Sequence, residues 1–293
     1  MKGLERLGLG TVQWGLPYGI ANQHGTTPPA TVALILSEAR SRGVCVLDTG
    51  ALYGDAESVL GGNDLEGFHV VSKTPRFATS SIRDEQARAL VQVFEQSLRR
   101  LSCGKLYGLL VHHANDLLVP GGRKLWDAMS DLKEQGRVDK VGVSVYDGEQ
   151  IDGVLKLFKP DIVQLPLSVL DQRMLRSGHL ERLSDLGVEV HTRSAFLQGL
   201  LLTPPEKVPE YFEPIRPLLL RWRSAAQEQD LTPVQAALSF VRDIPWVGKV
   251  LVGVENLEHF RNCIEDFTAG TGFDASGLAC DTPEFINPTL WKT

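Results

Sequence analysis

The sequence alternates between short apolar runs and longer amphipathic stretches. Eight runs of β-branched and aliphatic residues are apolar almost continuously, which is typical of parallel strands covered on both faces. These runs occupy residues 7–13, 44–49, 68–74, 106–112, 140–146, 161–166, 188–194 and 249–253. Strand–helix units that repeat in one direction predict a parallel sheet, and eight of them without a linker predict closure into a barrel. A doubly wound open sheet is the alternative fold.

The stretches between the runs have apolar residues at three- and four-residue steps, which predicts helices. We expect these helices over residues 31–42, 81–101, 125–135, 148–158, 174–186, 221–241 and 257–267. The length favours a single-domain (β/α)8 barrel over residues 1–293. Two segments fall outside the repeat, the proline-rich segment 203–217 and the Gly-, Thr- and Asp-rich tail 268–293. We interpret both as covers over the rim of the barrel; the alternative is a surface loop and a tail packed on the outside.

Composition limits the classes of function. The net charge of −6 provides no general basic field that could hold nucleic acid by its phosphates. No run of about 18 apolar residues is present, so no membrane span is expected. The first six residues lack the apolar core of a signal peptide. The four cysteines are scattered without a C-x-x-C pair, which indicates reduced thiols in a cytoplasmic protein rather than a disulfide framework or a zinc site.

Reactive side chains stand where neighbouring strands are predicted to end. Asp48, Lys73 and His112 end the second, third and fourth apolar runs, and Tyr53 lies in the loop after Asp48. The carboxyl ends of the strands of a parallel barrel share one rim, so these side chains can converge on one cavity. An ammonium lowers the pKa of a nearby phenol, and a carboxylate keeps the ammonium charged. The set predicts protonation of a carbonyl oxygen, with hydride supplied by a nicotinamide cofactor.

Several segments, in order, resemble the aldo-keto reductase family over nearly the whole chain. The matching segments are Leu-Gly-Leu-Gly-Thr at 7–11, Leu-Asp-Thr-Gly-Ala-Leu-Tyr-Gly at 47–54, Val-Ser-Lys-Thr at 71–74, Leu-Leu-Val-His at 109–112, Gly-Arg-Val-Asp-Lys-Val-Gly-Val-Ser at 136–144 and Val-Gln at 163–164. The resemblance implies a (β/α)8 barrel that binds NAD(P)H without a Rossmann motif, and no G-x-G-x-x-G is present. It implies that Tyr53 is the general acid, that Lys73 and Asp48 tune it, and that His112 orients the carbonyl group.

The same resemblance assigns residues to the cofactor. Ser144 and Gln164 would hold the nicotinamide amide, and Arg193 stands where many members place an aromatic ring beneath the nicotinamide. A cation there would disfavour the positively charged oxidised cofactor and so favour reduction. The other expected cofactor contacts are Gly10, Thr11, Ser194, Gly253, Glu255, Glu258 and Asn262. NADP(H) is the family default and is favoured over NAD(H), although Glu255 and Glu258 occupy a segment where NADP-binding members commonly have cations.

The first loop narrows the expected substrate. Residues 10–22 resemble bacterial members linked to sugar and polysaccharide metabolism. Trp14 and Tyr18 would lie at the substrate mouth, with packing against the C-terminal tail as the alternative, and His113 would line the mouth or face outward. The sequence thus predicts an NAD(P)H-dependent oxidoreductase for a small aldehyde or ketone, with a sugar-derived carbonyl compound suggested by the subgroup.

Two other functions stay open. A cofactor-sensing regulatory subunit with slow chemistry would keep the same four residues. An aldolase or isomerase that uses Lys73 as a Schiff-base nucleophile fits less well, because Asp48 is expected to keep that lysine charged. A metal site of His112, His113 and Asp116 is disfavoured because adjacent residues of a strand point to opposite faces, and no metal is expected. The sequence leaves the oligomeric state open.

Overall fold

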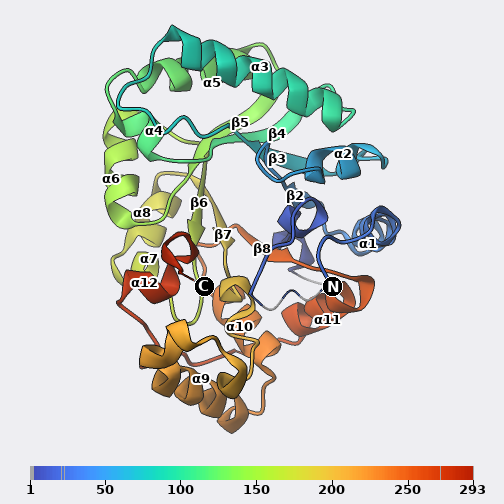
Figure 1. Ribbon diagram of the computed structural model, residues 1–293, viewed down its shortest axis with the longest axis vertical. Coiled ribbons are helices and arrows are strands. Elements are labelled where there is room, and N and C mark those ends of the chain that lie inside the picture. Colours follow the sequence, from blue (N-terminus) through green and yellow to red (C-terminus); the bar gives the residue numbers. More distant parts are fainter. Residues whose placement is uncertain (1–2, 21, 23, 271, 293) are drawn as a thin grey trace.

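Eight parallel strands form a closed barrel in the order of the sequence (Figure 1). The computed structural model describes residues 3–20, 22, 24–270 and 272–292. The strands are β1 (Leu7–Gly10), β2 (Val46–Asp48), β3 (His69–Lys73), β4 (Leu106–Val111), β5 (Val138–Ser144), β6 (Ile162–Pro166), β7 (Glu189–Arg193) and β8 (Lys249–Gly253). Since β8 pairs with β1, no edge is left open, and the predicted single-domain barrel is confirmed over the doubly wound sheet.

The longer helices lie around the outside of the strands (Figure 1). The helices are α1 (Pro29–Arg42), α2 (Ala56–Gly61), α3 (Asp84–Arg100), α4 (Asn115–Leu118), α5 (Arg123–Glu134), α6 (Gly148–Leu157), α7 (Arg173–Arg176), α8 (His179–Asp185), α9 (Arg216–Glu228), α10 (Pro233–Arg242), α11 (Leu257–Thr268) and α12 (Pro283–Ile286). Their buried leucines, isoleucines and valines pack with those of the strands in one large apolar cluster. A second, smaller apolar cluster consists of Val71 on β3, Leu110 on β4 and Ile162 on β6. None of the described helices has the length and apolar character needed to cross a bilayer.

Two helices predicted as continuous are each broken in two. The stretch 174–186 divides into α7 and α8 because Gly178 adopts a left-handed φ of 76°. The stretch 221–241 divides into α9 and α10. Thr232 begins α10 by accepting a hydrogen bond from the amide of Gln235, and Pro233 occupies the first turn. The predictions missed these two breaks because apolar periodicity continues across each of them.

The two segments predicted as covers pack against each other. Phe212 of the segment 203–217 is fully buried, and its ring centroid lies 4.9 Å from that of Trp291 in the tail. The Tyr211 hydroxyl donates to the carbonyl oxygen of Glu284 at 2.9 Å. Residues 271 and 293 of the predicted tail, and residues 1–2 of the N-terminal segment, lie outside the described residues. The covering role of both segments stays a prediction.

Candidate active site

The four side chains predicted to be catalytic meet at one rim of the barrel, and we call Asp48, Tyr53, Lys73 and His112 the rim cluster. Asp48 and Lys73 end β2 and β3, and His112 follows β4 directly. The Lys73 Nζ lies 2.6 Å from Asp48 Oδ2 and donates to the Thr49 carbonyl oxygen at 2.8 Å. The same Nζ lies 4.8 Å from the centre of the Tyr53 ring, and the Tyr53 and His112 ring centroids are 5.8 Å apart. A carboxylate, an ammonium, a phenol and an imidazole thus form a chain of neighbouring groups, in the order Asp48, Lys73, Tyr53 and His112.

Tyr53 is held in place by two glycines where the loop after β1 meets the loop after β2. A Cβ at Gly15 would lie 2.0 Å from the carbonyl oxygen of Tyr53, which only glycine avoids. Gly54 adopts a φ of 54°, and a Cβ there would lie 2.3 Å from the carbonyl oxygen of Gly15. The backbone that carries the phenol is therefore fixed by direct packing against the first loop.

Burial and charge act in opposite directions on the rim cluster. Burial raises the pKa of Tyr53, and the Lys73 cation opposes this without overcoming it. The expected lowering of the Tyr53 pKa is therefore corrected: the phenol has a pKa above its ordinary value and stays protonated near neutral pH. Burial alone would lower the pKa of Lys73, but Asp48 and Tyr53 outweigh burial and raise it, so the ammonium stays charged.

His112 is a neutral imidazole at physiological pH. Burial, together with the Lys73 cation, lowers the pKa of His112 to about 3. Its Nδ1 is buried and has no hydrogen-bond partner among the described residues. A neutral ring carries one N–H and one free lone pair, so His112 can donate a hydrogen bond to a carbonyl oxygen without adding charge to the site.

A cavity of about 450 Å³ runs from the rim cluster to the beginning of α11. Asp48 and Tyr53 line one end of it. The predicted binding residues that line it are Gly10, Thr11, Tyr18, Arg193, Ser194, Gly253, Glu255 and Asn262. Sequence reasoning missed other lining residues, which include Gln13, Asn22, Phe196, Gln198, His259 and Cys263. These residues follow β1 and β7 or lie on the first turns of α11. Their positions could have identified them, because the sequence already predicted cofactor contacts in the same segments.

Three predicted binding residues, Trp14, Ser144 and Gln164, are buried and are not among the described residues that line the cavity. The Trp14 side chain is 1% exposed, and its Nε1 donates to the carbonyl oxygen of Val254 at 3.2 Å. This indole is therefore part of the core rather than of the substrate mouth predicted for it. Ser144 and Gln164 are buried neighbours on β5 and β6. The Gln164 Nε2 donates to Asp48 Oδ1 at 2.7 Å, so this amide holds the carboxylate of the rim cluster.

The remaining predicted substrate and cofactor residues lie nearer the surface. Tyr18 lines the cavity, and its hydroxyl accepts a hydrogen bond from Gln198 Nε2 at 2.9 Å. The His113 ring is 4.8 Å from that of His112, and burial lowers the pKa of His113. Glu258 lies in the first turn of α11 and is not among the described residues that line the cavity.

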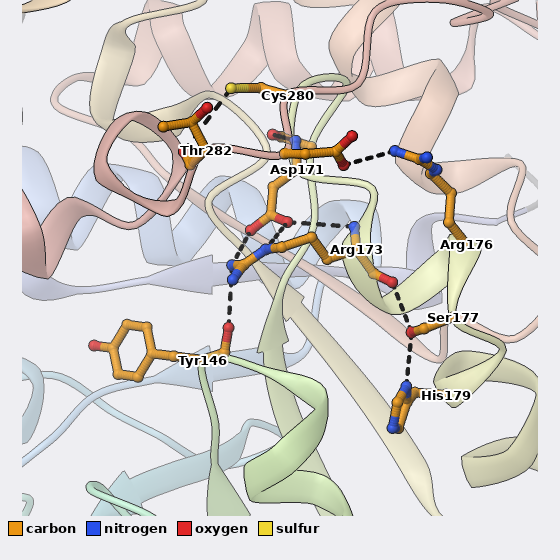
Figure 2. A network of polar contacts seen from close by, with 10 residues as sticks. Tyr146, Asp171, Arg173, Arg176, Ser177, His179, Cys280 and Thr282 are labelled. Atoms are coloured by element: carbon orange, nitrogen blue, oxygen red, sulfur yellow. Dashed lines mark hydrogen bonds and ion pairs between the residues drawn. The ribbon is translucent and has the colours of Figure 1, made fainter.

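Arg193 ends β7 at the cavity and rests on an aromatic ring. Its guanidinium lies 4.3 Å from the centre of the Tyr146 ring and donates to the Val145 carbonyl oxygen at 3.1 Å. Figure 2 shows that the Tyr146 carbonyl oxygen in turn accepts from Arg173, which pairs with both oxygens of Asp171 at 2.8 Å. Asp171 is 1% exposed, and its ion pair with Arg173 supports the backbone of Tyr146, whose ring contacts Arg193. No sequence motif indicated this ion pair.

Buried polar atoms without partners show that the site suits a nicotinamide dinucleotide. Thr11 Oγ1, Gln13 Oε1 and Gln164 Oε1 are buried without a hydrogen-bond partner among the described residues. An unmade hydrogen bond of this kind costs about 1–3 kcal/mol. The carboxamide and hydroxyl groups of such a cofactor could supply the missing partners. Gly253 lines the same cavity, and a Cβ there would lie 2.4 Å from the Gln13 side-chain amide. A glycine at this position therefore leaves room for the Gln13 amide beside a cofactor.

The carboxylate that could have completed a metal site serves the backbone instead. Asp116 accepts hydrogen bonds from the amides of Phe77 and Ala78, each at 3.1 Å. Its oxygens hold the loop after β3. The described part of the chain contains no group of three metal-binding side chains.

Comparison with known proteins adds to the geometry. The sequence model of the aldo/keto reductase family matches residues 6–269. An uncharacterised oxidoreductase of Mycobacterium tuberculosis is 28% identical over 285 residues, covering 87% of this chain and 83% of that protein. A glyoxal reductase of Bacillus subtilis is 27% identical over 187 residues, covering 60% of this chain and 63% of that protein. An aldo/keto reductase from Klebsiella pneumoniae, solved in complex with NADP and acetate, has a TM-score of 0.66 and 20% identity, covering 92% of this chain and 87% of that one.

The matched residues contain all eight strands and the rim cluster. The barrel, the convergence of four reactive side chains at its rim and the family match agree with one another. The chain belongs to the aldo/keto reductase family.

Proposed function

We propose that the protein reduces an aldehyde or ketone to an alcohol with a nicotinamide dinucleotide. The observation that carries the proposal is the rim cluster, in which a protonated phenol opens to a cavity and is backed by a buried ammonium–carboxylate pair. When bound, the cofactor supplies the hydride. The glyoxal reductase and the NADP complex among the similar proteins support this chemistry.

The side chains of the rim cluster have separate tasks in this proposal. Tyr53 holds a proton on its hydroxyl and gives it to the carbonyl oxygen as negative charge develops there. Lys73 stabilises the phenolate that remains, and Asp48 holds the ammonium in place. Gln164 holds Asp48 through the hydrogen bond at 2.7 Å. The neutral His112 donates an N–H to the carbonyl oxygen and orients it.

Other groups would bind the two reactants. Thr11, Ser144 and Gln164 would meet the nicotinamide amide, and Arg193 would lie against its ring and favour the reduced cofactor. Tyr18 and His113 would meet the substrate. The proposed substrate is a small carbonyl compound derived from a sugar. The proposed location of the protein is the cytoplasm, and we propose no nucleic-acid or membrane partner. The oligomeric state stays open.

The test is steady-state turnover of the purified protein with a panel of aldehydes and ketones. Oxidation of NADH or NADPH is followed by absorbance, and binding is followed separately by tryptophan fluorescence. We expect turnover of at least one substrate, with about 100- to 10,000-fold less in Tyr53→Phe. Full activity in that variant would show that the acid is another residue. Tight cofactor binding without turnover of any substrate would favour the regulatory subunit instead.

A further inference from the structure

We infer that this protein binds NAD(H) in preference to NADP(H), and that Glu255 rejects the 2′-phosphate. The inference rests on the proposed function, because it takes the cavity to be a dinucleotide site. It replaces the expectation of NADP(H), which came from the family default. The observation behind it is how charge is distributed along the cavity.

The cavity has a reactive end and a far end. Asp48 and Tyr53 mark the reactive end, whereas Glu255, His259 and Asn262 line the far end at the beginning of α11. A dinucleotide whose reactive ring lay beside Tyr53 would extend along the cavity and place its second nucleoside at the far end. The side chains there would meet the ribose that carries either a 2′-hydroxyl or a 2′-phosphate.

The far end has one carboxylate and no lysine or arginine among the described residues that line it. Arg193 is the only lysine or arginine among the described residues that line the cavity, and it lies at the reactive end against Tyr146. Glu255 contributes a carboxylate at the far end. A carboxylate accepts hydrogen bonds from ribose hydroxyls, whereas a phosphate needs cationic donors and is repelled by it. The same end therefore attracts one cofactor and excludes the other.

Arg261, the one lysine or arginine of α11, already forms an ion pair with another helix. The Arg261 Nη2 lies 3.1 Å from Glu38 Oε2 on α1. Glu38 also pairs with Arg42 at 3.2 Å. Arg261 therefore points to a neighbouring helix, and a 2′-phosphate would have to take it from that pair.

The N-terminus of α11 already carries a side-chain cap and a negative charge. Asn256 caps the helix by accepting a hydrogen bond from the His259 amide at 2.8 Å. Glu258 adds a negative charge in the first turn. Asn256 occupies one amide, and Glu258 offsets the positive helix end, so the helix N-terminus offers less compensation for the missing cations.

The experiment measures binding and needs no turnover. NADH and NADPH, and the fragments 5′-ADP and 2′,5′-ADP, are titrated into the full chain by calorimetry. We expect NADH to bind about 10- to 100-fold more tightly than NADPH. A hydrogen bond to a charged group contributes about 1.5–3 kcal/mol, and only NADH can make this bond to Glu255. The fragments should show the same order.

Three variants locate the cause. Glu255→Gln removes the charge but keeps the shape of the side chain, and it should reduce the preference for NADH over NADPH. Glu255→Lys should reverse that preference. Glu265→Lys makes the same charge change at an exposed position of α11 away from the cavity, and it should leave the ratio as it is. Tighter or equal binding of NADPH by the wild-type protein, or an unchanged ratio in both Glu255 variants, would overturn the inference and leave the proposed function intact. Failure of both dinucleotides to bind would overturn the proposed function itself.

Discussion

The rim cluster has a counterpart at the opposite end of the barrel. Tyr107, Lys140, Glu189 and His191 lie at or near the beginnings of β4, β5 and β7, and we call them the basal cluster. The Lys140 Nζ is 4.9 Å from the centre of the Tyr107 ring, nearly the separation of ammonium and phenol in the rim cluster. The same four kinds of side chain thus meet twice in one molecule.

The two clusters differ in what holds the phenol. In the basal cluster the Tyr107 hydroxyl donates to Glu189 Oε2 at 2.7 Å, and Lys140 pairs with the same oxygen. The His191 Nε2 lies 2.9 Å from Glu189 Oε1. In the rim cluster, Lys73 and the Gln164 amide each donate to one oxygen of Asp48. Within the described part of the chain, the Tyr53 phenol makes no hydrogen bond to that carboxylate, and Tyr53 lines the cavity. The two clusters thus differ in whether the carboxylate accepts the hydrogen bond of the phenol.

Removal of each phenol oxygen tests this difference most strongly. Tyr53→Phe should lower kcat by about 100- to 10,000-fold, because a general acid supplies that much. The affinity for cofactor should not change, which a fluorescence titration checks. Tyr107→Phe is the matched control and should keep wild-type kcat. An equal loss of kcat in the two variants would show that the effect is structural.

Breaking the ion pairs should separate the clusters in stability. Asp48→Asn leaves the Lys73 ammonium, whose side chain is 1% exposed, without a carboxylate. We expect this to lower the free energy of unfolding by about 3–5 kcal/mol. Glu189→Gln should cost about 1–3 kcal/mol, because the Lys140 side chain is 34% exposed and water can solvate it. Urea unfolding measures both, and the reverse order would contradict the assigned burial.

Acid should weaken the two clusters in different pH ranges. The pKa of His112 is about 3, against an ordinary value of 6.5. Between those values the unfolded chain binds the extra proton, so stability is greatest above pH 6.5 and falls by up to about 1.4 kcal/mol per pH unit below it. Burial raises the pKa of Glu189, but hydrogen bonds from His191 and Lys140 outweigh it and hold the pKa below its ordinary value.

The contribution of Glu189 is therefore present above its ordinary pKa of 4.5 and is lost only as the pH falls through the depressed value. Unfolding free energies measured at successive pH values separate the two groups. His112→Asn should flatten the profile between pH 6.5 and 4.5, where Glu189 still contributes fully, and leave the loss that Glu189 causes below pH 4.5. A profile that keeps its slope in this variant would argue against a neutral His112.

The smallest expected effect is on the stability of Tyr107→Phe. The variant loses one hydrogen bond to a carboxylate in a partly exposed place, which should cost about 1 kcal/mol. For a domain of this size the loss corresponds to a fall in Tm of about 2–4 °C. A thermal melt checks it. A change of more than about 10 °C would mean that the basal cluster does more than hold the base of the barrel.

The strand-end members of the rim cluster could be predicted because their meeting depends on strand order. Once eight parallel strands are recognised, the ends that carry Asp48 and Lys73 must share a rim. The contacts that were missed depend on packing between distant segments. Trp14 looked like a mouth residue, but its partner Val254 lies 240 positions away along the chain. The direction of the Tyr53 pKa was wrong for the same reason, since the depth of burial is decided by loops whose conformation no motif encodes.

The contact between Gly15 and the Tyr53 backbone limits how this enzyme can be redesigned. The first loop carries Tyr18 at the cavity and also packs against the Tyr53 backbone, so insertions near Gly15 would move the Tyr53 phenol along with this part of the cavity lining. A library meant to change selectivity while preserving rate should hold that glycine constant. It should instead diversify the stretch after β7, where Phe196 and Gln198 line the cavity.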